Sequence, residues 1–171
     1  MTDRTILHLF ADTGIEDEVL HTFGDVTRVG IDPNPNPFST AIQADATEPP
    51  VAGGFDLAVA HPPCQRWSVA TEGGGGDPES HPNLIDDARR VCRRLADHYI
   101  IENVPNAPLR DPVVFSGGQF GLPIHYARAF ETSFSVEQPP MQNKIAETST
   151  FYYTEWSKGE WAAVKGTDID M

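Results

Sequence analysis

The chain has 171 residues, with 25 acidic and 12 basic side chains and a net charge of −13. This length is enough for one domain with a substantial hydrophobic core. The acidity excludes a broadly basic surface for nucleic acid, and no apolar run is long enough to cross a membrane.

Cysteine usage and the first residues indicate a cellular compartment. The sequence has two cysteines, Cys64 and Cys92, in dissimilar surroundings. Such a pattern favours a reduced, intracellular protein over a disulfide-stapled one. The first residues lead directly into a strand-like segment and lack the pattern of a signal peptide. We therefore expect a cytoplasmic protein without a membrane partner, and strong acidity also suits a high-salt host.

Five apolar segments have the length and composition of buried strands. They are residues 5–10, 26–31, 41–44, 55–60 and 99–101. A further segment, 127–134, is interpreted as a strand or a hairpin arm. Helical spacing falls at 15–23 and at 81–97. This alternation predicts an α/β, Rossmann-like fold, in which a mostly parallel twisted sheet carries helices on both faces.

The two predicted helices are amphipathic. The inner face of the first comprises Ile15, Val19, Leu20 and Phe23. The inner face of the second comprises Leu84, Ala88, Val91, Cys92 and Leu95. The arginines of the second helix are expected on a solvated face: Arg89, Arg90, Arg93 and Arg94. Residues 1–134 form the predicted core, and 135–171 form a C-terminal extension, with a possible hairpin of 151–153 and 161–164, rather than a separate domain.

Polar residues follow four of the predicted strands. They are Asp32, Asp45, Cys64 and Glu102. Because parallel strands end at one edge of an open sheet, these side chains are expected along a single crevice. Two carboxylates after the second and third strands suit ribose hydroxyls and an exocyclic amine.

Cys64 stands behind Pro62 and Pro63 at the end of the fourth strand. Two prolines cannot continue a sheet, so they form a rigid turn there. A thiol held at that edge is placed for chemistry, but a lone cysteine is also commonly a small buried hydrophobe. The cysteine alone leaves both interpretations open.

Several segments together resemble the DNA (cytosine-5-)-methyltransferases. Residues 63–68, Pro-Cys-Gln-Arg-Trp-Ser, are similar to the nucleophile motif of that family, and 102–104 match its Glu-Asn-Val motif. Weaker similarities are found at 9–14, 81–84 and 120–132. They cover residues 5 to 134 in the family's order, and Arg-Ala-Phe-Glu-Thr at 128–132 looks most like short, phage-type members without a target-recognition domain. This resemblance also implies a possible virus-encoded origin.

The resemblance implies an S-adenosyl-L-methionine-dependent methyltransferase fold and an activity. Cys64 would add to carbon 6 of cytosine in DNA, Glu102 would hold or protonate N3, and Arg128 would bind O2. Further catalytic-loop residues would be Pro63, Gln65 and Asn103. Contacts to S-adenosyl-L-methionine, with S-adenosyl-L-homocysteine as product, would come from Phe10, Ala11, Gly14, Asp32, Pro33, Asp45, Ala46, Pro62 and Leu84.

Some features depart from the family pattern. Asp12 replaces a glycine of the first motif, and only about 40 residues follow the arginine motif. The chain therefore offers few groups for reading base edges, so low sequence specificity is expected. A second copy or a partner subunit would complete the cofactor pocket.

Two other readings stay open from the sequence. The chain is alternatively a catalytically degenerate binding or regulatory subunit. The same chemistry also suits RNA or a free cytosine nucleotide. No metal site is predicted from cysteine spacing, and His61, His81 and His98 are expected to be loop or surface residues rather than bases of a cysteine hydrolase.

Overall fold

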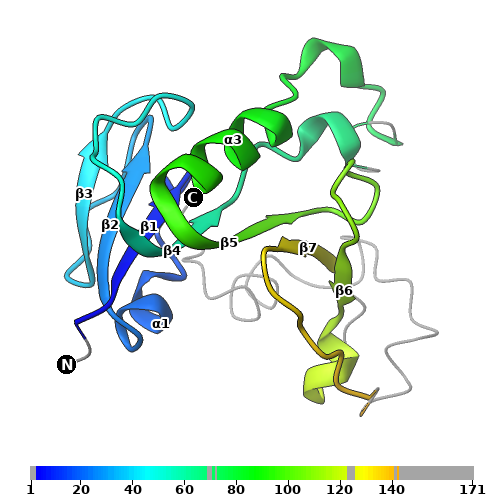
Figure 1. Cartoon of the computed structure of the whole chain (residues 1–171). Helices are drawn as coiled ribbons and strands as arrows, with labels where there is room; N and C mark the ends of the chain where they lie inside the picture. The colour runs from blue at the N-terminus through cyan, green and yellow to red at the C-terminus, as the bar shows by residue number, and fades with distance from the viewer. Residues whose placement is uncertain (1–2, 69–70, 72, 123–125, 141, 143–171) are drawn as a thin grey trace. The chain divides into compact units, whose positions relative to one another are not determined.

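Seven strands form one sheet in the described part of the chain, in the order β3-β2-β1-β4-β5-β7-β6 (Figure 1). Their bounds are β1 Thr5–Leu9, β2 Asp25–Gly30, β3 Ser39–Gln43, β4 Phe55–Ala60, β5 Ala96–Asn103, β6 Val113–Phe115 and β7 Arg128–Thr132. The first five in spatial order pair in parallel, and β7 runs antiparallel to β5. The expected α/β class with a mostly parallel sheet is confirmed, and the arrangement is consistent with a Rossmann-like fold.

This computed structural model describes residues 3–68, 71, 73–122, 126–140 and 142. The chain divides into two units. One comprises residues 1–114 and 128–137, and the other comprises 115–127 and 138–171. The assignment of residues 1–134 to a catalytic core and of 135–171 to an extension stays a prediction. The expected hairpin of 151–153 and 161–164 lies outside the described residues. None of the described helices combines the length and apolar character that a membrane span requires.

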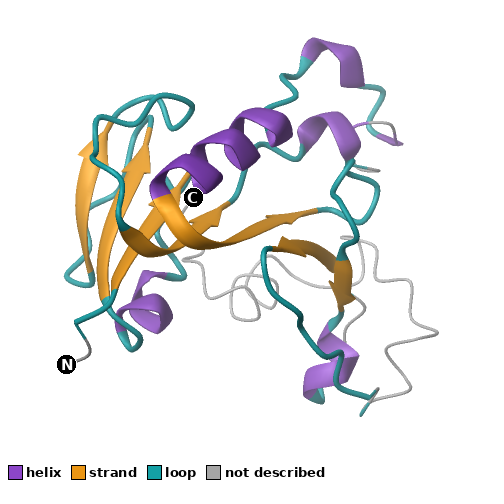
Figure 2. Ribbon diagram, viewed as in Figure 1, coloured by secondary structure: helices purple, strands orange, loops and turns teal. Residues whose placement is uncertain are grey.

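One face of the sheet is covered by α3 (Ile85–Leu95), as Figure 2 shows. Strand side chains alternate between faces, so Leu7 and Leu9 of β1 point to the same side. They pack in one buried cluster with Ala88, Val91 and Leu95 of α3. This cluster, at the centre of the sheet, is the main hydrophobic core, and the predicted inner face of the helix is confirmed for Ala88, Val91, Cys92 and Leu95.

The opposite face carries α1 (Asp17–His21). A smaller apolar cluster lies here, formed by Ile6, Val26 and Val59 with Leu20 of α1 packed against it. Polar side chains also lie buried on this face, His8 and Arg28 among them. We call the two sides the α3 face and the α1 face.

The first helix differs from the sequence prediction. Val19 and Phe23, expected to face inward, are 61% and 54% exposed, whereas Asp17 is fully buried. The reason is electrostatic, because Asp17 pairs with His8 and Arg28 beneath the helix. That anchoring rotates the short helix away from the orientation that its apolar spacing favours.

The second helix is shorter than predicted, and one of its arginines is misassigned. Arg89 is 4% exposed rather than solvated, because Glu131 of β7 receives its guanidinium. The helix ends at Leu95, and β5 begins at the next residue without a loop.

The smaller unit is described only in part. It contains a short 3-10 helix, Gly117–Phe120, which begins directly after Ser116. Gln119 stabilises the local fold, because its Oε1 accepts from the Ser116 N–H and its Nε2 donates to the Pro139 carbonyl.

Candidate active site

The end of β4 places Cys64. The backbone N–H of His61 donates to the Leu9 carbonyl, which extends the pairing of β1 with β4 by one residue. Pro62 has no N–H to continue it. The Pro62 carbonyl instead accepts from Asn103 Nδ2 at 2.8 Å. Cys64 follows this tie, half-buried, as the residue before the 3-10 helix Gln65–Trp67.

Glu102 is the centre of a polar contact beside this turn. Its Oε1 lies 2.7 Å from Arg128 Nε, and its Oε2 lies 3.1 Å from His61 Nδ1. The side chains of Glu102 and Arg128 are 17% and 28% exposed. Glu102 and Arg128, both predicted catalytic residues, thus lie together. The hydrogen bond of Asn103 joins this pair to the turn that carries Cys64.

The segment after Cys64 is fixed by Arg66. Its guanidinium pairs with Glu79, donates to the His81 carbonyl and lies 5.5 Å from the centre of the Trp67 ring. These contacts connect the two ends of the glycine-rich stretch between 68 and 78. Gln65 beside it is exposed and Pro63 is half-buried.

The loops after β1 and β2 form the predicted cofactor half. Asp12 Oδ1 accepts from the backbone N–H of Asp32, and the Asp12 carbonyl accepts from that of Asn34. Arg28 donates to the carbonyls of Ala11 and Asp12. Asp12 therefore links the loop after β1 to the loop after β2.

Left-handed backbone in the first loop occurs at Phe10, with φ of 57°, and at Gly14, with φ of 60°. Gly14 also has no room for a side chain, because a Cβ there would collide with Arg28 and Asp17. Only glycine meets both demands without strain.

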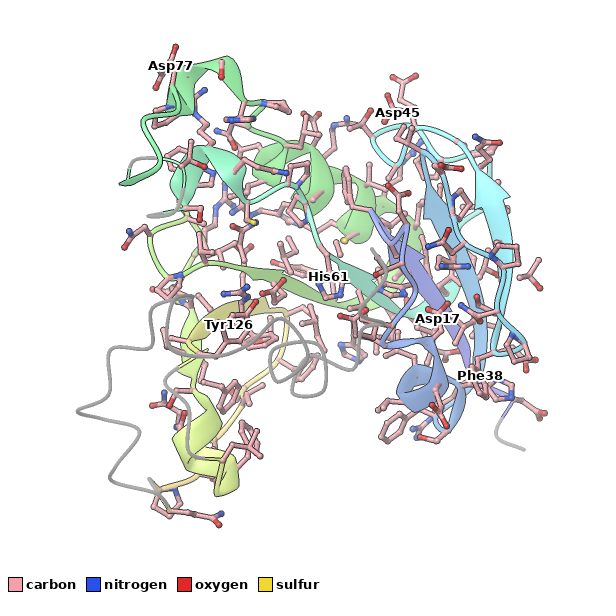
Figure 3. All side chains as sticks on the ribbon, turned by 180° about the vertical axis from the view of Figure 1, so that it is seen from behind. Asp17, Phe38, Asp45, His61, Asp77 and Tyr126 are labelled. Carbon is pink, nitrogen blue, oxygen red and sulfur yellow. The ribbon has the colours of Figure 1, made fainter. Side chains whose placement is uncertain are left out.

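The acidic ends of β2 and β3 lie at the same edge. Gly30 pairs with Gln43, so Asp32 and Asp45 each follow their strand by two residues. Both carboxylates are exposed, and Figure 3 labels Asp45. The Asp45 carboxylate accepts from the Thr47 N–H and hydroxyl, and these hydrogen bonds lower the pKa of Asp45.

The remaining predicted cofactor residues differ in burial. Ala11, Ala46 and Pro62 are buried, and Phe10, Pro33 and Leu84 are half-buried. Exposed carboxylates beside two glycine- or proline-containing loops fit a nucleoside with free hydroxyl and amine groups.

Three buried polar residues on the α1 face escaped the sequence interpretation: His8, Asp17 and Arg28. Asp17 accepts from Ser39 at 2.6 Å and from Asn36 at 2.7 Å, lies 2.6 Å from His8 Nδ1, and pairs with Arg28 Nε at 3.1 Å. Burial alone raises the pKa of Asp17, but the hydrogen bonds from His8, Ser39 and Asn36 outweigh it and lower the pKa to about 2. A signal was present, since His8 and Arg28 interrupt apolar strands.

His61 lies in the loop directly after β4, within the loop-or-surface expectation, and is half-buried there. Its side chain is only 22% exposed, and its ring packs edge-on against that of His8, with centroids 5.1 Å apart. Burial lowers the pKa of His61, but the hydrogen bond with Glu102 and nearby carboxylates overcome this and raise it. Burial lowers the pKa of His8 despite its bond to Asp17. His98 is exposed, as expected, and His81 is half-buried.

Comparisons with known proteins bear on the fold. No protein-family model matches the chain, and no curated protein matches it. Its fold is similar to that of Thermoplasma acidophilum 1320, with a TM-score of 0.50 and 14% identity over 77% of this chain and 80% of the other. A conserved hypothetical protein of Streptococcus pyogenes aligns with a TM-score of 0.42 and 14% identity over 75% of this chain and 83% of that one. The first likeness supports a shared α/β fold alone, and the second is too distant to support an argument.

Proposed function

We propose that the chain is an S-adenosyl-L-methionine-dependent cytosine-5 methyltransferase that acts on DNA with low sequence specificity. The observation that supports this most directly is the hydrogen bond from Asn103 Nδ2 to the Pro62 carbonyl. It joins the Pro-Cys-Gln turn to the Glu-Asn-Val segment, whose Glu102 is paired with Arg128. The three motifs that resemble the family therefore meet at one edge of the sheet.

The chemistry needs a nucleophile and groups that accept charge on the ring. The Cys64 thiolate forms a bond from Sγ to carbon 6 of cytosine, and the displaced electron pair makes carbon 5 nucleophilic. S-adenosyl-L-methionine, held by the 10–14 loop, Asp32 and Asp45, would supply the methyl group that carbon 5 accepts, with S-adenosyl-L-homocysteine as the product. Loss of the carbon 5 proton to a base then expels the thiolate and restores the ring. Glu102 and Arg128 are the groups available to hold N3 and O2 during this sequence.

The cofactor half fits the donor in its types of residue. Asp32 and Asp45 offer exposed carboxylate oxygens for ribose hydroxyls and an adenine amine, and the 10–14 loop offers a closely held backbone. The donor supplies an electrophilic methyl group when bound. Asp12, whose carboxylate is bonded to the Asp32 N–H, positions the loop for it.

A covalent trap tests the proposal. An oligonucleotide with 5-fluorocytosine lacks the proton that must leave carbon 5, so an enzyme of this class stays attached to it. Wild-type protein with donor is expected to form an adduct that survives denaturing electrophoresis, and Cys64→Ser is expected to form none. Cys92→Ser is the matched control, because Cys92 is fully buried and burial raises its pKa to about 12. Equal trapping by Cys64→Ser and wild type contradicts the proposal.

The nucleic-acid substrate requires its own measurement. Labelled donor is incubated with protein and with DNA, RNA or a free cytosine nucleotide, and the nucleosides are analysed by mass spectrometry. We expect 5-methylcytosine from DNA. Label found only in RNA or only in the free nucleotide would support the proposed chemistry and contradict DNA as the substrate.

A second candidate function is a methyltransferase-like binding subunit without catalysis. It is favoured by the engagement of both Glu102 oxygens with His61 and Arg128. Calorimetry with S-adenosyl-L-homocysteine, together with the trap, separates the candidates. Ligand binding without trapping supports the binding subunit, and binding with trapping supports the enzyme.

A further inference from the structure

Two arms of ion pairs approach each other across the α1 face. One arm is Arg28, Asp17 and His8. The other arm is Arg128, Glu102 and His61. Strand register explains why these groups share one face of the sheet. His8 pairs with Arg28 and with Val59, and His61 follows Val59 by two residues, so it lies on the same side. Figure 3, which views the sheet from behind, labels Asp17 and His61 on this side.

The arms end in imidazole nitrogens that have no hydrogen-bond partner. In both rings Nδ1 lies against a carboxylate, Asp17 for His8 and Glu102 for His61. Nε2 of each ring is buried and unpartnered. His8 is fully buried, so this atom has no access to water. A neutral histidine whose Nδ1–H is donated to a carboxylate presents a lone pair at Nε2, and a buried lone pair without a partner is costly.

Glu16, the residue before α1, supplies a negative charge at this position. Its Oε2 lies 3.9 Å from His8 Nε2. One ligand atom from each of His8, Glu16 and His61 lies within 4.8 Å of the others. A metal ion about 2.0–2.2 Å from each ligand would hold such atoms roughly 3–4 Å apart, so the groups need to approach by about 1 Å. The Glu16 side chain is 45% exposed and has the freedom to do so.

We propose that His8, His61 and Glu16 bind one divalent transition-metal ion of the zinc class. Two imidazoles and one carboxylate form a ligand set that Zn²⁺, Co²⁺ and Fe²⁺ accept, with a further position for water. Each imidazole has the carboxylate behind it that metal-binding histidines typically have, and that contact sets the tautomer and the ring orientation. Arg28 and Arg128 in turn fix these carboxylates. The ion would connect β1, α1 and the end of β4.

The test measures metal binding without cofactor or nucleic acid. Tag-free protein is treated with a chelator and dialysed against Zn²⁺ or Co²⁺. We expect one ion per chain, visible absorption bands with Co²⁺, and a Zn²⁺-dependent rise in Tm. Glu16→Gln and His61→Asn are expected to weaken the affinity for the ion by about 100-fold or more. Loss of a group that only hydrogen-bonds to a metal ligand typically costs about 10–100-fold, and loss of a ligand itself should cost more.

Two exposed residues of α1 provide the matched controls. Glu18→Gln and His21→Gln remove the same groups outside the cluster and are expected to keep wild-type affinity. The proposal is overturned if wild-type protein takes up no ion, if Glu16→Gln and His61→Asn bind as wild type does, or if the controls lose binding equally. Glu16→Gln keeps the test decisive even where His61→Asn fails to fold. This inference is independent of the proposed function, so failure of methyl transfer leaves it standing.

Discussion

The two faces of the sheet bury apolar side chains to different extents. The α3 face is filled by an apolar cluster in which Leu9, Val91 and Ile101 have no exposed area. The α1 face has a smaller apolar cluster, and its other buried groups are His8, Asp17 and Arg28. Stability from hydrophobic burial is thus concentrated on the α3 face, which also buries the ion pair of Arg89 with Glu131. The α1 face buries fewer apolar side chains beside its ion pairs.

The largest expected effect comes from removing Asp17 of the α1 face. Asp17→Ala leaves the fully buried Arg28 guanidinium without its carboxylate and removes the partners of Ser39 and Asn36. Removing one partner of a buried ion pair typically costs about 3–5 kcal/mol. Urea denaturation is the measurement, and Glu18→Ala on the same helix is the control, expected within about 0.5 kcal/mol of wild type. Equal stability of the two variants would show that the α1 face is not held together by Asp17.

The next effect concerns the apolar spacing of the two helices. Leu95→Ala empties part of the main core and is expected to cost about 2–5 kcal/mol. Val19→Ala, at a position with the same apparent spacing, is expected to cost less than about 0.5 kcal/mol because Val19 is 61% exposed. Denaturation midpoints of both variants decide the matter. A cost at Val19 as large as that at Leu95 would support the inner face that the sequence pattern predicts.

These two helices show what the sequence makes predictable. The inner face of α3 follows from spacing because its neighbours are apolar strands that any apolar side chain can pack against. The orientation of α1 depends instead on Asp17 meeting His8, Arg28 and Asn36. No local pattern encodes pairings over such sequence distances, so the burial of an aspartate in place of Val19 was unpredictable.

The site shows a similar division. The positions of Cys64 and Glu102 at one edge follow from where apolar runs end, because parallel strands end together. The ion pairs of Glu102 with His61 and Arg128 did not follow, since no local pattern marks either pairing. The positions of loops at strand ends follow from the order of the strands. The partners of side chains follow from the register between strands, which the sequence pattern does not determine.

The contribution of Glu131, a buried residue of the α3 face, to the stability of the protein is expected to depend on pH. Burial raises the pKa of Glu131, but the hydrogen bonds from Arg89 and from the Arg110 N–H outweigh it and lower the pKa. A depressed folded pKa means that the unfolded chain binds the proton more tightly, so the contribution is present above the ordinary value of 4.5 and is lost as the pH falls below it. Wild-type stability should therefore fall more steeply with acid than that of Glu131→Gln. Denaturation between neutral pH and pH 3 measures this, with Glu48→Gln as an exposed control that should follow the wild-type curve; parallel curves for Glu131→Gln and wild type would contradict it.

The smallest expected effect lies in the loop where Arg28 reaches from the α1 face to the predicted cofactor half. Asp12→Ala removes the acceptor of the Asp32 N–H and is expected to cost about 0.5–1.5 kcal/mol, the net worth of one hydrogen bond. Asp12→Asn keeps an oxygen at that position and should retain most of the stability, whereas Thr13→Ala, an exposed neighbour, should change nothing measurable. Because the same bond positions Asp32, calorimetry should show weaker S-adenosyl-L-homocysteine binding for Asp12→Ala than for Asp12→Asn. Tighter binding by Asp12→Ala would mean that the negative charge of Asp12 opposes the ligand more than its hydrogen bond helps, and that would reverse the role assigned to this residue.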